Sequence, residues 1–256
     1  MTVVVAVLCD GGVVVGTDSS ATCGGLGLRT MEQEVRKVVV LRDEVIVAGT
    51  GEVGLGQRFV EIADDLAKKK VFSQKTPLDA ARELCRLARA DFESTGACKQ
   101  VTSGSGQFLS ADYGALVAFP NHNQPQLIEF AVGTLQPEMR TATSVWYASL
   151  GSGQLIADPF LGLMRKTFCP SGPPSLPTGR FITCWALDHT IDLNPGGIDG
   201  PIELAVLEAD ASGQLRAREL PEEELQEHLV SVAEVHEHLA GFADRFDPAR
   251  ESKIPD

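Results

Sequence analysis

Residues 2–22 read TVVVAVLCDGGVVVGTDSSAT, and this stretch decides the fold. Val3 to Cys9 and Val13 to Thr17 are rich in β-branched residues, and Asp10-Gly11-Gly12 stands between them. β-branched residues favour strands, and an Asp-Gly pair between two such runs is a strong hairpin signal. The chain is therefore predicted to open with a β-hairpin.

The same design recurs once before the first helix. Lys37 to Leu41 and Val45 to Ala48 flank Arg42-Asp43-Glu44, so four strands are expected first, paired antiparallel. Helical periodicity then covers Val53 to Lys70, and a second helix is expected after Thr76-Pro77. We expect these two helices to pair as a helical hairpin.

The second half of the chain repeats the order of strands followed by helices. Gln100 to Gln107 is a polar Gly/Ser stretch that predicts a loop. The later expectations are strands at Tyr113 to Phe119, Gln126 to Ala131 and Val145 to Leu150, helices at Leu155 to Phe168 and Arg180 to Ile191, and a hairpin of Ile202 to Glu208 with Leu215 to Arg218. This order predicts an α+β fold, in which two facing sheets with helix pairs outside would bury the apolar faces.

The last part of the chain is predicted to be one long amphipathic helix, Pro221 to Phe246, followed by a charged tail. Its apolar residues fall on one side: Leu225, Leu229, Val232, Leu239 and Phe242. We therefore divide the chain into a domain over residues 1–218 and a C-terminal helical extension over residues 219–256.

Composition excludes several function classes. The chain has 256 residues, of which 43% are apolar, and 22 Lys and Arg stand against 35 Asp and Glu, for a net charge of -13. Proteins that bind the phosphate backbone of nucleic acid need positive charge, so we do not expect nucleic acid as a partner. No apolar run approaches the roughly 18 residues that span a bilayer, and the first basic residue is Arg29, which excludes a secretory signal. We expect a cytoplasmic protein that does not cross a membrane.

Three local sequence patterns could mark a functional site, but each has a more common structural explanation. Gly49 to Gly54 matches GxGxxG, but a lysine-rich helix end follows where a dinucleotide site needs a second parallel strand. Asp188 and Asp192 are four residues apart on a predicted helix, where most such pairs are solvated. The six cysteines form no CxxC pair, so we expect reduced packing residues and neither a metal nor a cofactor.

The strongest chemical signal is Thr2. Removal of Met1 would leave a threonine that carries both a hydroxyl and a free α-amine. The amine has a reference pKa of about 7.7 to 8.0, so it can accept the hydroxyl proton near neutral pH. Thr2 is thus a candidate N-terminal nucleophile that needs no other base.

Five ordered motifs surround this signal and cover Thr2 to about Arg218. The run from Thr2 to Thr22, which contains Asp18, resembles the opening of proteasome β subunits. Lys37 follows as the first lysine of the chain, and Ala48-Gly49-Thr50-Gly51 is similar to the glycine turn of that family. Gly151-Ser152-Gly153 resembles the family's Gly-Ser-Gly, and residues 192–197, DLNPGG, resemble its Asp-x-x-Ser-Gly-Gly.

The resemblance implies a fold and a catalytic set. The fold would be the four-layer α/β/β/α sandwich of N-terminal nucleophile hydrolases, with an additional C-terminal helix. Thr2 would be the nucleophile, Lys37 would stabilise the developing alkoxide, and Asp18 would hold the Lys37 ammonium. The Gly51 N–H would form the oxyanion hole, and Ser152 with Asp192 would fix the amine and the hydrolytic water.

The same resemblance implies substrate contacts and partners. Substrate-binding residues would be Ser20, Ala21, Thr22, Gly49, Gly51 and Val53, and the backbone of Thr22 and Gly51 would pair with an extended peptide. Gly49 would leave a deep specificity pocket that tolerates large side chains. The chain would form a homo-oligomer of two stacked seven-membered rings, acting on peptides or unfolded proteins, and the C-terminal helix would pack on the ring surface or at its mouth.

Departures from the family pattern leave two alternatives open. Pro195 stands where the family has a second serine, the loop from Cys23 to Val35 is enlarged, and Ser20 stands where the family has an arginine. One alternative is a catalytically silent ring scaffold or binding module of the same fold, which a retained Met1 would also produce. The other is an amidase or transpeptidase for a small substrate.

Overall fold

The computed structural model describes residues 1–23, 31–103, 106–194, 198–243 and 246. The described part is α+β, as predicted, with two five-stranded sheets, two two-stranded ribbons and six helices. Every strand pairing within these sheets and ribbons is antiparallel.

The first sheet is built on the N-terminal hairpin. Strand β1 (Val4–Cys9) pairs with β2 (Gly12–Asp18), and Gly11 takes a left-handed φ of 80° in the turn. The sheet order is β12-β1-β2-β13-β14. Its other strands are β12 (Tyr147–Leu150), β13 (Ile202–Ala209) and β14 (Leu215–Glu219). Both predicted hairpins of this sheet are therefore confirmed.

The second sheet has the order β11-β10-β9-β6-β5. Its strands are β5 (Val38–Leu41), β6 (Val45–Gly51), β9 (Tyr113–Asn121), β10 (Gln124–Phe130) and β11 (Pro137–Arg140). Residues that alternate along β6 face opposite sides, as a pleated strand requires. Ile46 and Ala48 join a core cluster with β1 and β2, whereas Val45 and Val47 join a second cluster with helices α1 and α3.

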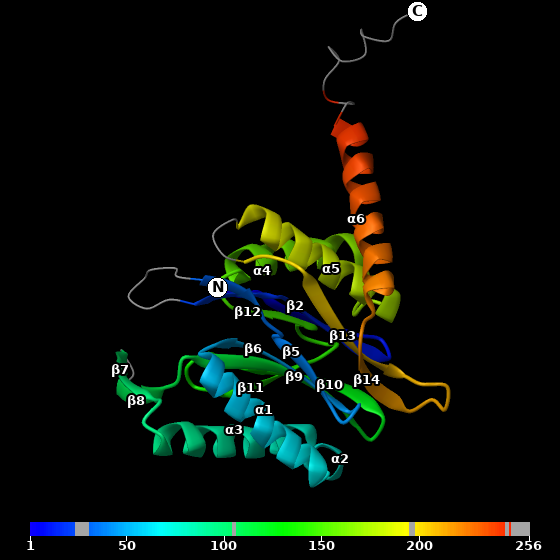
Figure 1. Cartoon of the computed structure of the whole chain (residues 1–256). Helices are drawn as coiled ribbons and strands as arrows, with labels where there is room; N and C mark the ends of the chain where they lie inside the picture. The colour runs from blue at the N-terminus through cyan, green and yellow to red at the C-terminus, as the bar shows by residue number, and fades with distance from the viewer. Residues whose placement is uncertain (24–30, 104–105, 195–197, 244–245, 247–256) are drawn as a thin grey trace, which may run out of the picture.

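Helices cover the outer face of each sheet (Figure 1). The helices α1 (Val53–Lys68), α2 (Val71–Gln74) and α3 (Pro77–Ser94) contact the second sheet, and α1 with α3 forms the predicted helical hairpin. The helices α4 (Gln154–Phe168) and α5 (Leu176–Leu193) contact the first sheet. Thr76 and Ser175 cap α3 and α5 through side-chain oxygens, which is the role of Ser and Thr before a proline-bearing first turn.

Two polar ribbons depart from the sequence expectations. The prediction of a loop over Gln100 to Gln107 is wrong, because β7 (Lys99–Ser103) and β8 (Gly106–Ser110) pair there. The strands β3 (Ser20–Cys23) and β4 (Met31–Glu34) form a second ribbon, so six strands and not four precede α1. Within the described residues, each ribbon forms a two-stranded sheet of its own.

The predicted C-terminal helix is present as α6 (Glu222–Ala243). Its first half packs against α5 and buries Leu225 and Val232. Leu239 and Phe242 remain 56% and 49% exposed, and Figure 1 shows the end of α6 standing away from the sheets. Only part of the predicted apolar stripe is therefore buried. Among the helices of the described part, none is long and apolar enough to cross a membrane.

Candidate active site

The centre of the candidate site is a buried ion pair. Asp18 ends β2, Lys37 precedes β5, and the Lys37 Nζ lies 2.8 Å from the Asp18 Oδ2. The Asp18 side chain is 0% exposed and that of Lys37 is 8% exposed. The other carboxylate oxygen of Asp18 accepts the Val3 N–H at 2.9 Å, which ties the pair to the start of β1.

Burial acts on the protonation of both partners. Burial raises the pKa of the Asp18 carboxyl, and the Lys37 charge and hydrogen bond oppose this rise. Burial likewise lowers the pKa of Lys37, against the attraction of Asp18. Desolvation therefore favours the neutral form of each group, and the 2.8 Å contact is what keeps the charged pair in place.

Lys37 donates to three oxygens, which uses all the N–H groups of an ammonium. Besides Asp18, its acceptors are the backbone carbonyls of Ser20 and Met1, the latter at 3.2 Å. The Thr2 hydroxyl donates to the same Met1 carbonyl at 2.7 Å. The Met1 carbonyl thus takes one hydrogen bond from Lys37 and one from Thr2.

The turn between β12 and α4 holds the backbone of Thr2. The Thr2 N–H donates to the Ser152 Oγ at 3.1 Å, and the Gly153 N–H donates to the Thr2 carbonyl at 3.2 Å. Gly151 has a φ of 95°, and a Cβ there would overlap the Thr2 carbonyl oxygen. The close approach and the left-handed backbone both require glycine at 151.

The end of β6 contributes two glycines. Gly51 is exposed, has a φ of 119°, and a Cβ there would overlap the carbonyl oxygen of Asp112. The Gly49 N–H donates to the Lys37 carbonyl at 3.4 Å, which sets this end of β6 beside Lys37. Val53 follows at the start of α1 and is 68% exposed.

The space over Gly49 is filled, contrary to the expectation of a deep pocket. A Cβ at Gly49 would overlap the phenol oxygen of Tyr113, which the sequence pattern did not single out. Tyr113 stands opposite Gly51 in the β6–β9 pairing, so its position depends on the register between strands distant in sequence. No sequence signal predicts that register.

The other predicted contact residues lie on β3. Ser20 is buried, and its carbonyl accepts from Lys37. The backbones of Ala21 and Thr22 pair with Gln33 and Glu32 of β4.

Asp192 lies in the last turn of α5 and is exposed. Its charge raises the pKa of Asp188, second to burial of Asp188 itself. Within the described residues, no hydrogen bond joins Asp192 to Thr2, Asp18 or Lys37. Gly51 likewise has no hydrogen bond to Thr2 among the described residues. Pro195 and the two glycines after it lie outside the described residues.

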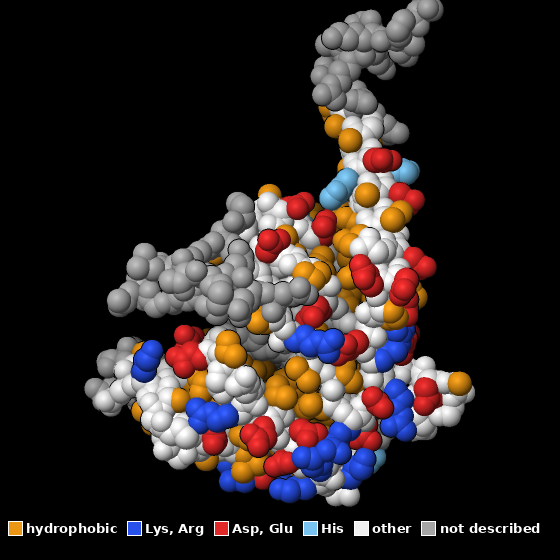
Figure 2. Space-filling model, in the orientation of Figure 1, with side chains coloured by type: hydrophobic (Ala, Val, Ile, Leu, Met, Phe, Trp, Pro, Cys, Tyr) orange, Lys and Arg blue, Asp and Glu red, His pale blue; other side chains and the backbone are white. Residues whose placement is uncertain are grey.

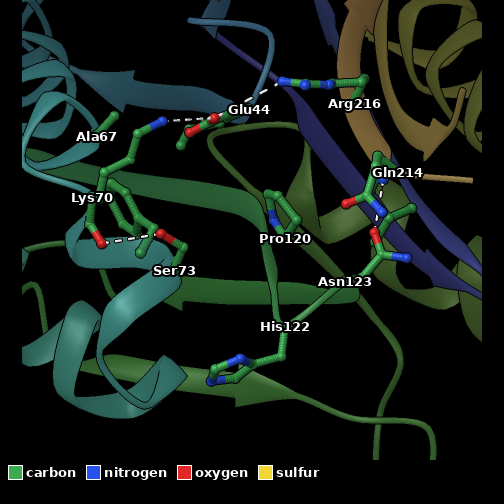
Figure 3. Close-up of a pocket in the computed structure, with 12 residues that line it drawn as sticks. Glu44, Ala67, Lys70, Ser73, Pro120, His122, Asn123, Gln214 and Arg216 are labelled. Atoms are coloured by element: carbon green, nitrogen blue, oxygen red, sulfur yellow. Dashed lines mark hydrogen bonds and ion pairs between the residues drawn. The ribbon is translucent and has the colours of Figure 1, made fainter. Parts of the chain in front are cut away.

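A cavity of about 240 Å³ lies at the opposite end of the sheets (Figure 3). It is lined by Lys70 and Arg216, and both cations face Glu44, at 3.0 Å and 3.9 Å. Figure 2 shows the same mixing of charges over α1 to α3, where Lys and Arg side chains alternate with Asp and Glu. The cations of this cavity are thus neutralised internally. No cluster that could hold a metal ion occurs among the residues described.

Comparison with known proteins agrees with this geometry. The model of the proteasome subunit family matches residues 2–104, the part that carries Thr2, Asp18, Lys37 and Gly51. The match supports the resemblance of this part of the chain to proteasome β subunits. Ser152 and Asp192 lie beyond the matched residues. No curated protein matches the chain at a significant level.

Proposed function

We propose that the protein is a threonine-type endopeptidase subunit in which Thr2 becomes the N-terminal nucleophile after removal of Met1. The observation that carries this proposal is the convergence on Thr2 of a buried Lys37–Asp18 pair and the Ser152 hydroxyl, from three separate parts of the chain. A Met-Thr start without these contacts would be weak evidence for a catalytic threonine. A buried lysine within reach of the Met1 carbonyl is the environment that an activated threonine needs.

Removal of Met1 changes the hydrogen bonds at this point. The Met1 carbonyl accepts from both the Lys37 Nζ and the Thr2 hydroxyl. Without it, one N–H of Lys37 and the Thr2 hydroxyl each need another partner, and Thr2 gains a free amine. Ser152, whose Oγ already accepts from the Thr2 nitrogen at 3.1 Å, would orient that amine.

The reaction would then run in two steps. The Thr2 Oγ attacks the peptide carbonyl carbon while the Thr2 amine takes the hydroxyl proton. The amine gives that proton to the leaving nitrogen, the C–N bond breaks, and an acyl ester on Thr2 remains. Water, activated by the same amine, attacks the ester and restores the hydroxyl.

The surrounding residues would stabilise these steps. The Lys37 charge favours the neutral amine and the developing alkoxide, with Asp18 fixing Lys37. The Gly51 N–H would donate to the oxyanion, a contribution of about 10² to 10³ in rate at comparable sites. Asp192 would assist the water, and Ser20, Ala21, Thr22, Gly49 and Val53 would line the path of an extended peptide.

The proposal extends to fold and assembly. Helices on the outer faces of two sheets that share a core support the four-layer α/β/β/α sandwich of N-terminal nucleophile hydrolases. We propose that residues 1–218 form this domain, that residues 219–256 are an extension, and that copies of the chain assemble as two stacked seven-membered rings in the cytoplasm. Peptides or unfolded proteins would be the substrates.

The test is hydrolysis of fluorogenic peptides by the wild-type chain, Thr2→Ser and Thr2→Ala. Thr2→Ser keeps both a hydroxyl and an amine and should retain turnover, whereas Thr2→Ala should lose it. Turnover that survives in Thr2→Ala contradicts the proposal. Absence of turnover in the wild-type chain, with Met1 retained, favours the silent ring scaffold, because the Thr2 hydroxyl is then held by the Met1 carbonyl.

A further inference from the structure

The distal half of α6, residues 233–243, carries an apolar stripe that the body of the chain does not cover. Val235, Leu239 and Phe242 are four and three residues apart, so they lie on one face of the helix. Val235 still packs partly against the core, but every residue from 236 to 243 is exposed. Phe246 extends the stripe, with its ring against that of Phe242 and 75% exposure. Figure 2 shows apolar side chains along this part of α6, and such an exposed patch is typical of a contact surface.

The helix α4 carries a second apolar stripe on its outer face. One side of α4 packs on the first sheet, and Leu155, Pro159 and Leu163 recur every four residues on the exposed side. Leu155 is 87% exposed and Leu163 is 52% exposed. Gly162 lies beside them, and a Cβ there would approach only the Tyr147 hydroxyl, at 3.6 Å. The outer face of a surface helix is usually polar, so this face has the composition of a site for another helix.

The charges beside the two stripes have opposite signs. The helix α6 contains no Lys or Arg, and Glu227 and Glu234 lie seven residues apart along one edge of its stripe. The last turn of α4 contains Arg165 and Lys166, and Lys166 lies one turn beyond Leu163 on the same face. Within the described residues, no ion pair joins any of these four side chains to a Lys, Arg, Asp or Glu. The acidic edge of α6 therefore complements the basic end of α4.

We infer that the distal half of α6 docks on the outer face of α4 in a second copy of this chain, with the two helices antiparallel. This direction places Glu234 beside Lys166 of the second copy. The apolar residues of the two stripes then meet in order: Leu239 with Leu163, Phe242 with Pro159, and Phe246 with Leu155. Both stripes extend over about three helical turns, so their lengths match.

Two other occupants fit the same stripes less well. The helix α6 leaves the body beside α5, and Figure 1 shows its end standing away from α4 of the same chain. Two distal halves of α6 could pair with each other, but both carry the acidic edge, and like charges across such a seam are unfavourable. The contact depends on chain concentration, so it does not enter the free energy of unfolding of separated chains.

A disulfide between two different chains tests the contact. Leu239→Cys and Leu163→Cys chains are produced together, with a tag on one of them, oxidised with copper phenanthroline and separated by mass on a non-reducing gel. Both positions are exposed, so neither substitution threatens the fold. A disulfide requires Cβ atoms within about 4.5 Å of each other, so the link reports on the proposed register. We expect a linked pair that contains one chain of each kind and that a reductant separates.

The matched control is Glu237→Cys in place of Leu239→Cys. Glu237 is two residues before Leu239, on the other side of α6, and should give no link to Leu163→Cys. The wild-type chain, oxidised in the same way, reveals any link through the native cysteines.

Three results would overturn the inference. One is the absence of a link between the Leu239→Cys and Leu163→Cys chains, and another is an equal link with Glu237→Cys. The third is a link between two Leu239→Cys chains in place of the mixed pair, which would mean that α6 pairs with α6. The link requires no peptide turnover and should also form in chains that carry Thr2→Ala, so its failure is separate from failure of the proposed peptidase function.

Discussion

The Lys37 ammonium lies 2.8 Å from the carboxylate of Asp18, whose side chain has no solvent exposure. Removing one member leaves a buried charge without its partner, which typically costs about 3–5 kcal/mol. We therefore expect Lys37→Met to lower the free energy of unfolding by that amount in chemical denaturation. Arg36→Ala is the matched control, because its pair with Glu219 is exposed and should contribute less than about 1 kcal/mol. Equal losses from the two variants would contradict the role of burial.

Gly151→Ala should disrupt the site without removing any polar side chain. The new Cβ would overlap the Thr2 carbonyl oxygen, and the φ of 95° disfavours alanine. Displacement of Thr2 by about 1 Å is enough to cost about 10²-fold in rate. We expect such a loss of peptide turnover. Gly162→Ala in α4 is the control, since only the Tyr147 hydroxyl lies near, at 3.6 Å. A fully active Gly151→Ala would refute the close approach.

Acidification should weaken the packing of α4 and α5 through His189. Burial, followed by the nearby His236, lowers the pKa of His189 below 6.5, and its ring stacks on Phe160 at 4.2 Å. A group with a depressed folded-state pKa contributes stability that is present above its unfolded pKa and is lost as the pH falls through the folded value. The wild-type Tm should therefore fall more than that of His189→Gln below pH 6.5. Parallel Tm curves for the two chains would count against this.

The two halves of α6 should respond differently to the same substitution. Leu225 is 8% exposed because it packs against the core, whereas Leu239 is 56% exposed. Leu225→Ala should lower the free energy of unfolding by about 2 kcal/mol or more, and Leu239→Ala should change it by less than about 0.5 kcal/mol. Denaturant titration of both variants measures this. A similar loss from Leu239→Ala would contradict the different packing of the two halves of α6.

Local signals predicted most of the two large sheets. The hairpin between β1 and β2 follows from Asp10-Gly11, and the start of α3 follows from Thr76-Pro77. The β7–β8 ribbon was missed because its residues are mostly polar and its apolar residues, Val101, Phe108 and Leu109, do not alternate, which is the signal on which strand prediction depends.

The sequence predicted only those residues of the candidate site that belong to a recognisable motif. The sequence singled out Thr2, Asp18, Lys37 and Ser152 through resemblance, and the structure brings them together. Tyr113 and the Val3 N–H were missed because their positions depend on strand register and on tertiary packing. The roles of these residues, and that of Asp192, remain predictions.

The central claim is that Thr2 carries a working hydroxyl and a free amine. The intact mass of the purified protein, before and after exposure to a peptide epoxyketone, tests it most directly, because this warhead reacts with both groups together. We predict a mass that lacks Met1 and gains one adduct per chain, with no adduct on Thr2→Ala. A mass that retains Met1, with no adduct, would contradict the account.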